Sequence, residues 1–551
     1  MNTRHFKFWP KRLPKELYYP QVPLFSIAET SAKYYPEKTA IDYYGKEITY
    51  AGLQRDIISL ATALKQMGVE KGDRVAVYLQ NSPHFCISFF GIMRANAVVV
   101  PLNPMLLEHE LSFLLQDSGS KVVIAAEDLL PRVEAVKEQC SIEIIVASYK
   151  DYLPQKFTLP VPDFVQADYS LPNDALTWKS IMTPKADPPP VEVKPDDLCM
   201  LPYTAGSTGI PKGCMHTNQT VLSNVLSAYH WTTYTSSSVT LGVLPFFHVT
   251  GLVHCFLTPV LAGAKNVVLS RWDRETAISA IEKHRCTHWI NISTMVTDLL
   301  STQNIEKRDL SSLACIGGGG APLPKAVGKK LEELTGLTYV EGYGLTETTS
   351  QTHFNPPDRA KLQCIGIPDF GVDARIVDVV TGKELPPGEE GELIINGPEV
   401  FKGYWNRPKE NEQAFMELDG KMFFKTGDVC YMDDEGYFFI VDRTKRMINV
   451  SGFKVWPAEV ENHLYTHPDI QEACVVGVPH PTKTEEVRAY VVLKEQARGK
   501  VSEEDIITWA KSQMSAYKYP RQVVFVNSLP ISGTGKILWK ELQDKAKQEN
   551  L

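Results

Sequence analysis

The feature that most constrains the fold is an alternation of helical and strand spacing that runs from Thr49 to Ala125. Apolar residues recur at helical spacing between Leu53 and Met67, after the capping residue Thr49 and before Gly68. Short strand-like and helical segments then follow in turn, at Val75–Leu79, Phe85–Met93, Val98–Val100, Leu106–Leu115 and Val122–Ala125. Such alternation is typical of a parallel sheet covered by helices on both faces. It predicts an α/β fold.

Three later regions depart from this alternation. Residues 153–196 are rich in proline, and we interpret them as an excursion between two sheet halves. From Ala374 to Ile440, strand-like segments separated by glycine turns indicate a small β-barrel-like unit. After Arg443 the helix and strand signals start afresh, with a helix-capping pattern at Ser502 and Asp505.

A chain of 551 residues is long enough for several packed units. We predict a large N-terminal domain, residues 1–443, made of two doubly wound sheets plus the β-barrel-like unit. We predict a small α+β C-terminal domain over residues 444–551.

Charge and cysteine usage exclude other classes of protein. The 57 Lys and Arg residues against 65 Asp and Glu give a formal net charge of −8, which disfavours a dedicated nucleic-acid-binding protein. The 10 cysteines include no C-x-x-C pair, so we expect neither a zinc site nor a disulfide framework. A reducing, cytoplasmic location fits this cysteine usage.

Two segments bear on membrane association. The basic N-terminus, MNTRHFKFWPKRLPKEL, lacks the continuous apolar stretch of a secretory signal. Leu241–Ala264 contains no Asp, Glu, Lys or Arg, but two prolines and two histidines interrupt it. We expect a helix buried in a large core there and no transmembrane span. Peripheral membrane contact and a homodimer both stay open.

The strongest local motif is the segment Tyr203–Gly213, which reads YTAGSTGIPKG. Its glycines permit tight turns that aim backbone N–H groups at an anion, and Ser207, Thr208 and Lys212 add hydroxyl donors and a charge. Pro211 stands where the Walker pattern requires glycine, and Gly213 stands where it requires Ser or Thr. The segment predicts a phosphate-binding loop of another kind.

This segment resembles the signature of the adenylate-forming, or AMP-binding, superfamily, which includes acyl-CoA synthetases, aryl-CoA ligases, luciferases and the adenylation domains of peptide synthetases. Further segments resemble the motifs of that family in the same order, and they are Leu244–Gly251, Gly317–Pro324, Tyr343–Thr348, Thr426–Asp428, Asp442–Lys445 and Ser532–Lys536. The resemblance extends over residues 25–540. It is specific for the superfamily and less so for the substrate.

The resemblance implies a site for ATP and Mg²⁺. Lys536, Thr346 and Glu347 would be catalytic, and Glu347 would also hold the magnesium ion. The residues implied in ATP and AMP binding are Thr204, Ser207, Thr208, Lys212, Gly319, Gly320, Ala321, Pro322, Glu341, Gly342, Tyr343, Gly344, Asp428, Ile440 and Arg443. The carboxylate of Asp428 has two acceptor oxygens, which suit the two hydroxyls of a ribose.

We also predict a helix capped by Thr534, with Lys536 in its first turn. The helix macrodipole disfavours a cation there by roughly 0.3 to 1 kcal/mol, so structure alone would not select a lysine. By resemblance, Lys536 bridges the attacking carboxylate and the α-phosphate.

Other positions are implied in the acid and CoA steps. Lys445 would be the hinge about which the mobile C-terminal domain turns between the two half-reactions. The acyl pocket would be lined by His248, Gly318, Gly320 and Gly342, and the CoA face would be formed by Ser451, Gly452, Phe453 and Lys454. Three residues depart from the pattern of the family, and they are Asn449, His480 and Lys540.

Together these patterns predict an ATP-dependent ligase that joins a medium- or long-chain fatty acid to coenzyme A. The acid would form an acyl-adenylate with release of pyrophosphate, and CoA would then displace AMP. The alternatives are an aryl-CoA ligase of the 4-coumarate type and an acyl-AMP ligase that loads a separate carrier protein. The non-enzymatic alternative is a nucleotide-binding sensor.

Overall fold

The computed structural model describes residues 3–182, 187–204, 210–451, 453–480, 484–531 and 537–549. The chain divides into two compact units. Unit 1 comprises Met1–Ala374, Ile395–Phe424 and Glu435–Tyr437, and unit 2 comprises Arg375–Ile394, Lys425–Asp434 and Phe438–Leu551. The domain boundary at residue 443 stays a prediction.

The first sheet of unit 1 has seven strands in the order β11-β8-β4-β3-β5-β6-β7. Its strands are β3 (Arg74–Tyr78), β4 (Val98–Pro101), β5 (Ser120–Ala126), β6 (Glu143–Ala147), β7 (Leu176–Thr177), β8 (Leu198–Met200) and β11 (His216–Thr217). All neighbours are parallel except β11, which is antiparallel to β8. The main helices in this part of the chain are α2 (Tyr50–Gln66), α3 (Pro83–Arg94), α4 (Glu108–Ser118) and α5 (Leu130–Cys140).

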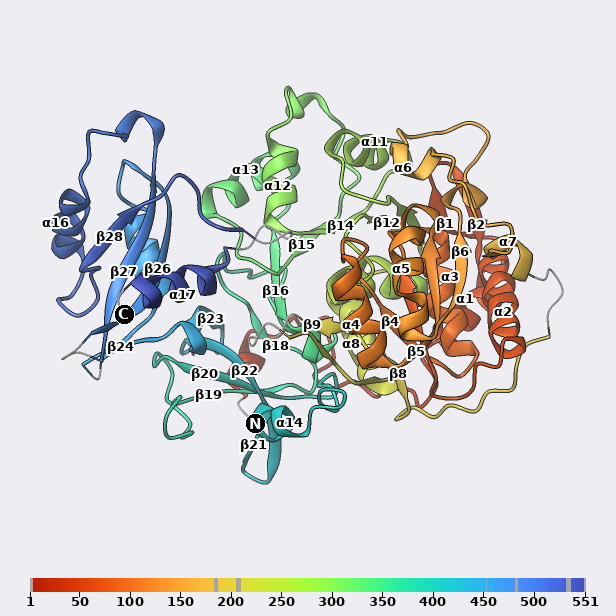
Figure 1. The fold of residues 1–551 in the computed structure, drawn as a ribbon, viewed down its shortest axis with the longest axis horizontal. Coiled ribbons are helices and arrows are strands. Elements are labelled where there is room, and N and C mark those ends of the chain that lie inside the picture. Colours follow the sequence, from red (N-terminus) through yellow and green to blue (C-terminus); the bar gives the residue numbers. More distant parts are fainter. Residues whose placement is uncertain are drawn as a thin grey trace. The chain divides into compact units, whose positions relative to one another are not determined.

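The second sheet of unit 1 has nine strands in the order β18-β17-β16-β15-β14-β12-β13-β1-β2. Its strands are β1 (Thr39–Tyr43), β2 (Lys46–Thr49), β12 (Val239–Gly242), β13 (Lys265–Val268), β14 (His288–Asn291), β15 (Cys315–Gly318), β16 (Val340–Gly344), β17 (Gln351–Phe354) and β18 (Ile367–Pro368). The main helices are α1 (Ser26–Tyr34), α8 (Asn218–Thr232), α11 (Arg274–His284), α12 (Ser293–Leu300) and α13 (Lys325–Thr335). The two helix-covered sheets of unit 1 are visible in Figure 1, and the predicted α/β class is confirmed.

Local sequence explains where the helices begin. The side chain of Thr49 accepts a hydrogen bond from the N–H of Gly52, so α2 starts one residue after the predicted cap. Ser502 and Asp505 form the predicted capping box of α16 (Glu503–Gln513). The interpretation of residues 153–196 is corrected, because this segment supplies β7 at one edge of the first sheet and then leads to β8 near the other edge.

Leu241–Ala264 is not one helix. It contains the end of β12 and then a helical stretch made of α9 (Val249–Leu252), the π-helical turn η4 (Val253–Leu257) and α10 (Thr258–Ala262). The amide of Asn266 donates to the carbonyl of Cys255 at 2.5 Å, which satisfies an oxygen in the π turn. Among the residues that the structure describes, no helix is long and apolar enough to cross a membrane.

The predicted β-rich region forms a five-stranded sheet. Its strands are β19 (Asp373–Val377), β20 (Gly391–Asn396), β21 (Phe415–Leu418), β22 (Lys421–Met432) and β23 (Phe438–Arg443), and α14 (Pro408–Ala414) precedes β21. The last sheet, in unit 2, consists of β24 (Ile448–Val450), β25 (Phe453–Val455), β26 (Ile470–His480), β27 (Thr484–Leu493) and β28 (Gln522–Phe525).

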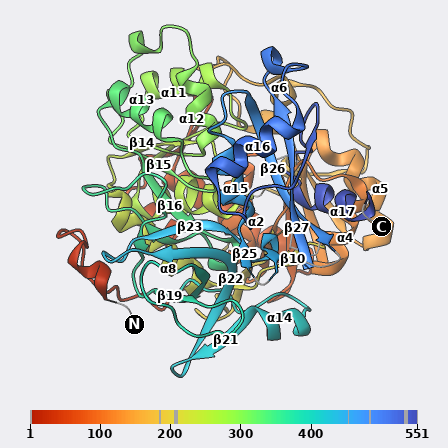
Figure 2. The same ribbon diagram turned by 90° about the vertical axis from the view of Figure 1, so that its left-hand side faces the viewer.

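The sheet of unit 2 is buried on both faces by helices. Alternate residues of β26 and β27 point to opposite faces. Val475 and Val491 belong to one apolar cluster with residues of α15 (Pro457–Leu464) and α16, whereas Val476 and Val492 belong to another with α17 (Trp539–Glu549). Figures 1 and 2 show these helices around the long β26–β27 pair. The predicted α+β character of the C-terminal region is confirmed.

Candidate active site

The predicted phosphate segment forms a hairpin in unit 1. Strands β9 (Tyr203–Thr204) and β10 (Lys212–Gly213) pair antiparallel, with Thr204 opposite Lys212. The predicted phosphate ligands Ser207 and Thr208 lie outside the described residues. Lys212 is only 9% exposed, and its Nζ lies 4.9 Å from the centre of the Tyr404 ring. The lysine charge is therefore held against an aromatic face near the end of the phosphate segment.

Glu347 lies in a tight turn between β16 and β17, and we call residues 344–351 the Glu347 turn. Two buried side chains bind carbonyl oxygens of this turn. His216 Nε2 lies 2.7 Å from the oxygen of Thr346, and Asn224 Nδ2 donates to the oxygen of Thr348 at 3.3 Å. Burial lowers the pKa of His216 to about 4, so the imidazole is neutral and donates from Nε2.

The carboxylate of Glu347 has a partner that the sequence analysis missed. The phenol of Tyr404 donates to Glu347 Oε1 at 2.7 Å, and the N–H of Phe401 donates to the backbone oxygen of Glu347 at 2.9 Å. The same Tyr404 ring lies under the ammonium group of Lys212. The segment GYW at 403–405 is the only sequence signal for this contact, and its partners are remote in the chain.

The predicted adenine-side residues lie on two neighbouring strands and the loop after the first. β15 pairs parallel with β16, so Gly318 lies opposite Glu341. Glu341 is buried, and its Oε1 accepts the N–H of Leu323 at 3.2 Å. Burial raises the pKa of Glu341 to about 7. Glu341 therefore fixes the glycine loop, residues 317–324, in which the predicted ligands Gly319, Gly320, Ala321 and Pro322 lie.

Close packing surrounds three of the predicted site glycines, against backbone at two of them and against an aromatic ring at the third. A Cβ at Gly318 would lie 2.0 Å from the oxygen of Asn291, and one at Gly344 would lie 1.6 Å from the oxygen of Ser350. A Cβ at Gly342 would lie 3.3 Å from the Phe354 ring. These contacts show that the three glycines are needed for packing, and the assignment of Gly318 and Gly342 to the acyl pocket stays a prediction. Tyr343, between two of these glycines, is buried and pairs with His353.

Gly320 is different, because its added Cβ would meet no atom within 4 Å. Its φ of 83° lies in the left-handed region, where a side chain costs on the order of 1 kcal/mol. Among the three glycines predicted to line the acyl pocket, only this one faces open space.

The predicted acyl segment is anchored by a residue of the other sheet. Asn81, which follows β3, accepts the N–H of Phe246 at 2.8 Å and donates to the oxygen of Leu244 at 2.9 Å. Gly251 permits close packing here, since its Cβ would lie 2.2 Å from the oxygen of Pro245. His248 is exposed at the start of α9. Asn81 therefore joins the two sheets of unit 1 at the acyl segment.

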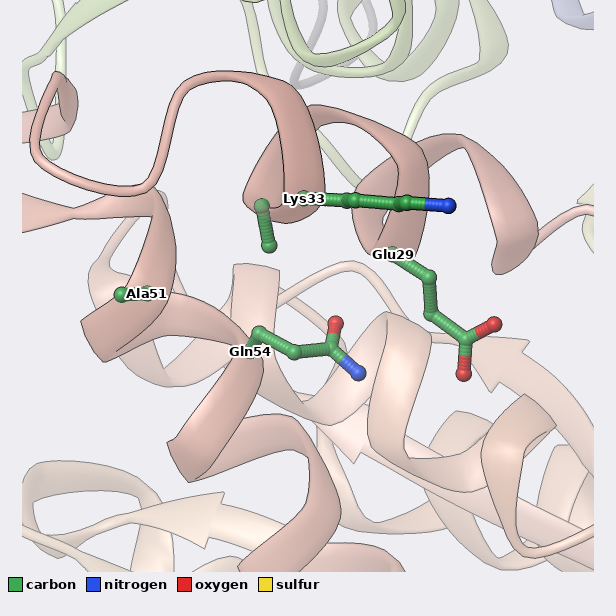
Figure 3. A pocket seen from close by; sticks show the side chains of 5 residues that line it. Glu29, Lys33, Ala51 and Gln54 are labelled. Atoms are coloured by element: carbon green, nitrogen blue, oxygen red, sulfur yellow. The ribbon is translucent and has the colours of Figure 1, made fainter.

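An open cavity of about 420 Å³ lies between α1 and α2 (Figure 3). Glu29 and Lys33 come from α1, and Ala51 and Gln54 come from α2. No residue predicted for the active site lines this cavity.

The predicted ribose residues meet in unit 2. Asp428 on β22 pairs with Arg443 on β23, and Arg443 Nε lies 2.5 Å from Asp428 Oδ1. Asp428 is 2% exposed, whereas the Arg443 side chain is 54% exposed. Ile440, on the same strand as Arg443, is 40% exposed. A carboxylate, a guanidinium group and an exposed apolar side chain are thus gathered on one pair of strands.

The predicted hinge residue Lys445 lies in the short helix η7 (Thr444–Arg446), directly after β23. Its neighbour Arg446 forms ion pairs with Asp442 and Glu461. Asp442 also accepts the N–H of Ala458 at 2.7 Å. Burial raises the pKa of Asp442 and of Glu461, and the Arg446 charge opposes that shift. The sequence analysis missed Arg446, although it directly follows the DRTK motif.

Two of the predicted CoA-face residues lie at a cavity of about 230 Å³ in unit 2. Ser451 and Phe453 line it together with Tyr517 and Arg521, which the sequence analysis did not identify. The Phe453 and Tyr517 rings stack with centroids 4.8 Å apart. Lys454 forms an ion pair with Asp378 at 3.0 Å. The two stacked aromatic rings, the guanidinium group of Arg521 and the carboxylate of Glu486 line this cavity.

Two predicted residues of unit 2 lie outside the described residues. Gly452 is one, and the catalytic candidate Lys536 is the other. The predicted helix cap Thr534 also lies outside the described residues. The helix α17 begins at Trp539, and Ile537, which was expected in the helix, forms an isolated β-bridge with Ile531.

Comparison with known proteins agrees with the motif pattern. Residues 28–405 match the AMP-binding enzyme family, and residues 459–536 match the AMP-binding enzyme C-terminal domain. A long-chain-fatty-acid–CoA ligase of Bacillus subtilis (strain 168) is 38% identical over 98% of this chain and 97% of its own length. A feruloyl-CoA synthase of Amycolatopsis sp is 34% identical over 93% of this chain and 96% of its own length.

A solved structure is also similar over nearly the whole chain. The crystal structure of ATP-bound MatB from Rhodopseudomonas palustris matches with a TM-score of 0.83 and 28% identity, over 97% of this chain and 100% of that one. The chain belongs to the AMP-binding enzyme family. The predicted resemblance and the predicted fold class are thereby confirmed.

Proposed function

We propose that the protein is an ATP-dependent fatty-acid–CoA ligase that works through an acyl-adenylate. The observation that carries this proposal is that Tyr404 contacts both Lys212, through its ring, and Glu347, through its hydroxyl. A cation and a carboxylate so placed suit a triphosphate and its magnesium ion. The similarity to the long-chain-fatty-acid–CoA ligase extends over nearly the full length of both chains, which supports the same class of reaction.

Glu347 and the adjacent Thr346 offer hard oxygen donors, which magnesium prefers. Magnesium commonly uses one or two carboxylates together with substrate phosphates, so a cage of protein ligands is not required. Within the described residues there is no cluster of three or more His, Cys, Asp or Glu side chains that could hold a metal, in keeping with that mode. When bound, the ion would spread the negative charge of the phosphates.

In the first half-reaction, a carboxylate oxygen of the acid attacks the α-phosphorus of ATP, and the bond to the β-phosphate oxygen breaks to release pyrophosphate. Lys212 would bind the phosphates, and Lys536 would bridge the two reacting anions. Asp428 would accept hydrogen bonds from the ribose hydroxyls, with Arg443 holding its carboxylate.

In the second half-reaction, the thiol of CoA loses its proton and its sulfur attacks the acyl carbonyl. The bond between that carbon and the phosphate oxygen breaks, and AMP leaves. The cavity at Ser451, Phe453 and Arg521 supports a role for this face in binding CoA. Lys445 would serve as the hinge that exchanges the two half-reactions.

A fatty acid is favoured because the first relative described above acts on long-chain fatty acids. The runner-up is an aryl acid, which the 34% identity to a feruloyl-CoA synthase supports. The other two alternatives have less support. An acyl-AMP ligase that loads a separate carrier protein would not require the small cavity at the CoA face, and a nucleotide-binding sensor would not require the catalytic candidate Lys536.

The proposal is tested with a panel of carboxylic acids, from butyrate to palmitate and including ferulate and benzoate. AMP release and thioester formation are measured with and without CoA. A fatty-acid ligase gives thioester that increases with chain length, because each buried methylene adds about 0.8 kcal/mol until the pocket ends. Preference for ferulate would support the aryl-CoA ligase instead. Adenylate without thioester would support carrier loading, and no turnover of any acid would support a sensor.

A further inference from the structure

The contacts of Tyr404 join two functional candidates that are remote in the sequence. Its phenol donates to Glu347 Oε1 at 2.7 Å, and its ring centre lies 4.9 Å from Lys212 Nζ. Because a carboxylate oxygen accepts, the phenol O–H is the donor of this hydrogen bond.

The backbone around Tyr404 is held as an added strand beside the phosphate hairpin. The N–H of Lys402 donates to the Met215 oxygen at 2.9 Å, and the N–H of Trp405 donates to the Gly213 oxygen at 2.8 Å. Tyr404 itself forms an isolated β-bridge with Cys214. The Tyr404 backbone is thus fixed in register with the residues that follow Lys212.

Side-chain contacts of Asn411 and Arg407 also hold the segment around Tyr404 in place. Asn411 accepts the N–H of Tyr404 at 2.6 Å and donates to its carbonyl at 3.0 Å. Arg407 forms an ion pair at 2.6 Å with Asp117, which also accepts the phenol of Tyr203 at 2.8 Å. One carboxylate therefore ties the start of the phosphate hairpin to the Tyr404 segment.

We propose that Tyr404 is a positioning residue for nucleotide binding, which orients the Glu347 carboxylate toward the magnesium ion and holds Lys212 toward the phosphates. This inference rests on the proposed magnesium role of Glu347. A carboxylate offers about four lone-pair positions, so one phenol bond on Oε1 is compatible with a metal bond to the same group. A fixed partner of this kind orients a ligand before the ion arrives, and its loss commonly costs about 10- to 100-fold in metal affinity.

The two contacts can be separated by substitution. Tyr404→Phe keeps the ring beneath Lys212 and removes the hydroxyl, whereas Tyr404→Leu removes both. Tyr437→Phe is a matched control, because Tyr437 is buried in unit 1 and donates to the backbone oxygen of Arg359 at 3.1 Å. Folding of each variant is checked by circular dichroism and by the midpoint of thermal unfolding.

The test is ATP binding by calorimetry without any acid, once with excess Mg²⁺ and once with EDTA. In the wild-type protein Mg²⁺ should strengthen ATP binding. We call the ratio of the ATP affinity with Mg²⁺ to that in EDTA the magnesium increment. Tyr404→Phe should reduce the magnesium increment about tenfold and leave the ATP affinity in EDTA unchanged. Tyr404→Leu should lose the same increment and also bind ATP more weakly in EDTA. Tyr437→Phe should match the wild-type protein.

The variant Glu347→Gln tests the magnesium role of Glu347 separately from the positioning role of Tyr404. If Glu347→Gln loses the magnesium increment while a folded Tyr404→Phe keeps it, Tyr404 has no positioning role and the magnesium role of Glu347 stands. If Glu347→Gln keeps the increment, Glu347 does not hold magnesium and the inference is overturned with it. A Tyr404→Phe variant that weakens ATP binding equally in Mg²⁺ and EDTA would also overturn it.

Discussion

The Glu347 turn of unit 1 and the hinge segment of unit 2, residues 442–446, are held in place by opposite kinds of contact. Neutral side chains, His216 and Asn224, bind the carbonyl oxygens of the Glu347 turn. In the hinge segment, Arg446 forms ion pairs with Asp442 and Glu461, which are all largely buried. The hydrogen bonds from these neutral donors do not depend on a charged partner. A segment held by buried charges depends on every partner being present.

The largest effect that this comparison predicts is on the stability of unit 2. Arg446→Met leaves Asp442 and Glu461 as buried carboxylates without their cation, which should cost about 3 to 5 kcal/mol of unfolding free energy. Lys518→Met is the control, since Lys518 pairs with Glu459 but both side chains are partly exposed, at 24% and 32%. It should cost less than about 1 kcal/mol. Urea denaturation measures both, and equal losses would contradict the dependence on buried charge.

The second prediction concerns the two half-reactions. Lys536→Ala should slow adenylate formation by about 3 to 4 kcal/mol in activation free energy, because one charge-assisted contact to the transition state is lost. Transfer from synthetic acyl-AMP to CoA should largely persist. Lys445→Pro should do the reverse, because proline restricts the backbone at the turning point. Stopped-flow assays of each half-reaction separate the two, and equal loss of both steps in either variant would refute this division.

A third prediction concerns how the stability of unit 1 depends on pH through the buried carboxyl group of Glu341. Burial raises the pKa of Glu341 to about 7 in the folded protein, above its ordinary value of 4.5. The folded protein therefore binds more protons between these values than the unfolded chain, so stability falls as pH rises from about 4.5 through 7.

The matched variant is Glu341→Gln, which keeps an acceptor oxygen for the N–H of Leu323. It should reduce the loss of unfolding free energy between pH 5 and 8 by roughly 1 to 3 kcal/mol. Thermal or urea unfolding across this pH range measures the effect. An unchanged pH profile would show that Glu341 is ionised in the folded protein at neutral pH.

The smallest predicted effect is the loss of stability when Gly320 is substituted, compared with the loss when Gly318 is substituted. Gly318→Ala should destabilise unit 1, because its Cβ would lie 2.0 Å from the oxygen of Asn291. Gly320→Ala should cost only about 1 kcal/mol, for its positive φ. If Gly320 faces the acyl chain, Gly320→Leu should shift the preferred acid to shorter chains with turnover retained. Unfolding curves and the acid panel measure these effects, and an unchanged chain-length preference would remove Gly320 from the pocket.

Much of this molecule can be predicted from sequence where the signal is local. Helical and strand spacing gave the α/β class, and Thr49 and Ser502 marked helix starts through side chains that bind nearby N–H groups. The motif residues Asp428 and Arg443 are indeed brought together, because two adjacent antiparallel strands carry them.

The parts that sequence did not predict depend on partners far along the chain. Tyr404 and Glu347 are 57 residues apart, and Asn81 and Phe246 are 165 apart. The sequence also did not show that a Cβ at Gly318 would meet the carbonyl of Asn291 on the neighbouring strand. Strand register decides such contacts, and motif spacing does not encode it.

The most direct test of the central claim is a two-stage single-turnover experiment with wild-type protein. The protein is mixed first with palmitate, ATP and Mg²⁺ without CoA, and CoA is added afterwards. The account predicts bound palmitoyl-AMP with an equal amount of pyrophosphate in the first stage, and palmitoyl-CoA with an equal amount of AMP in the second. Release of ADP and phosphate, or thioester formation without a preceding adenylate, would contradict it.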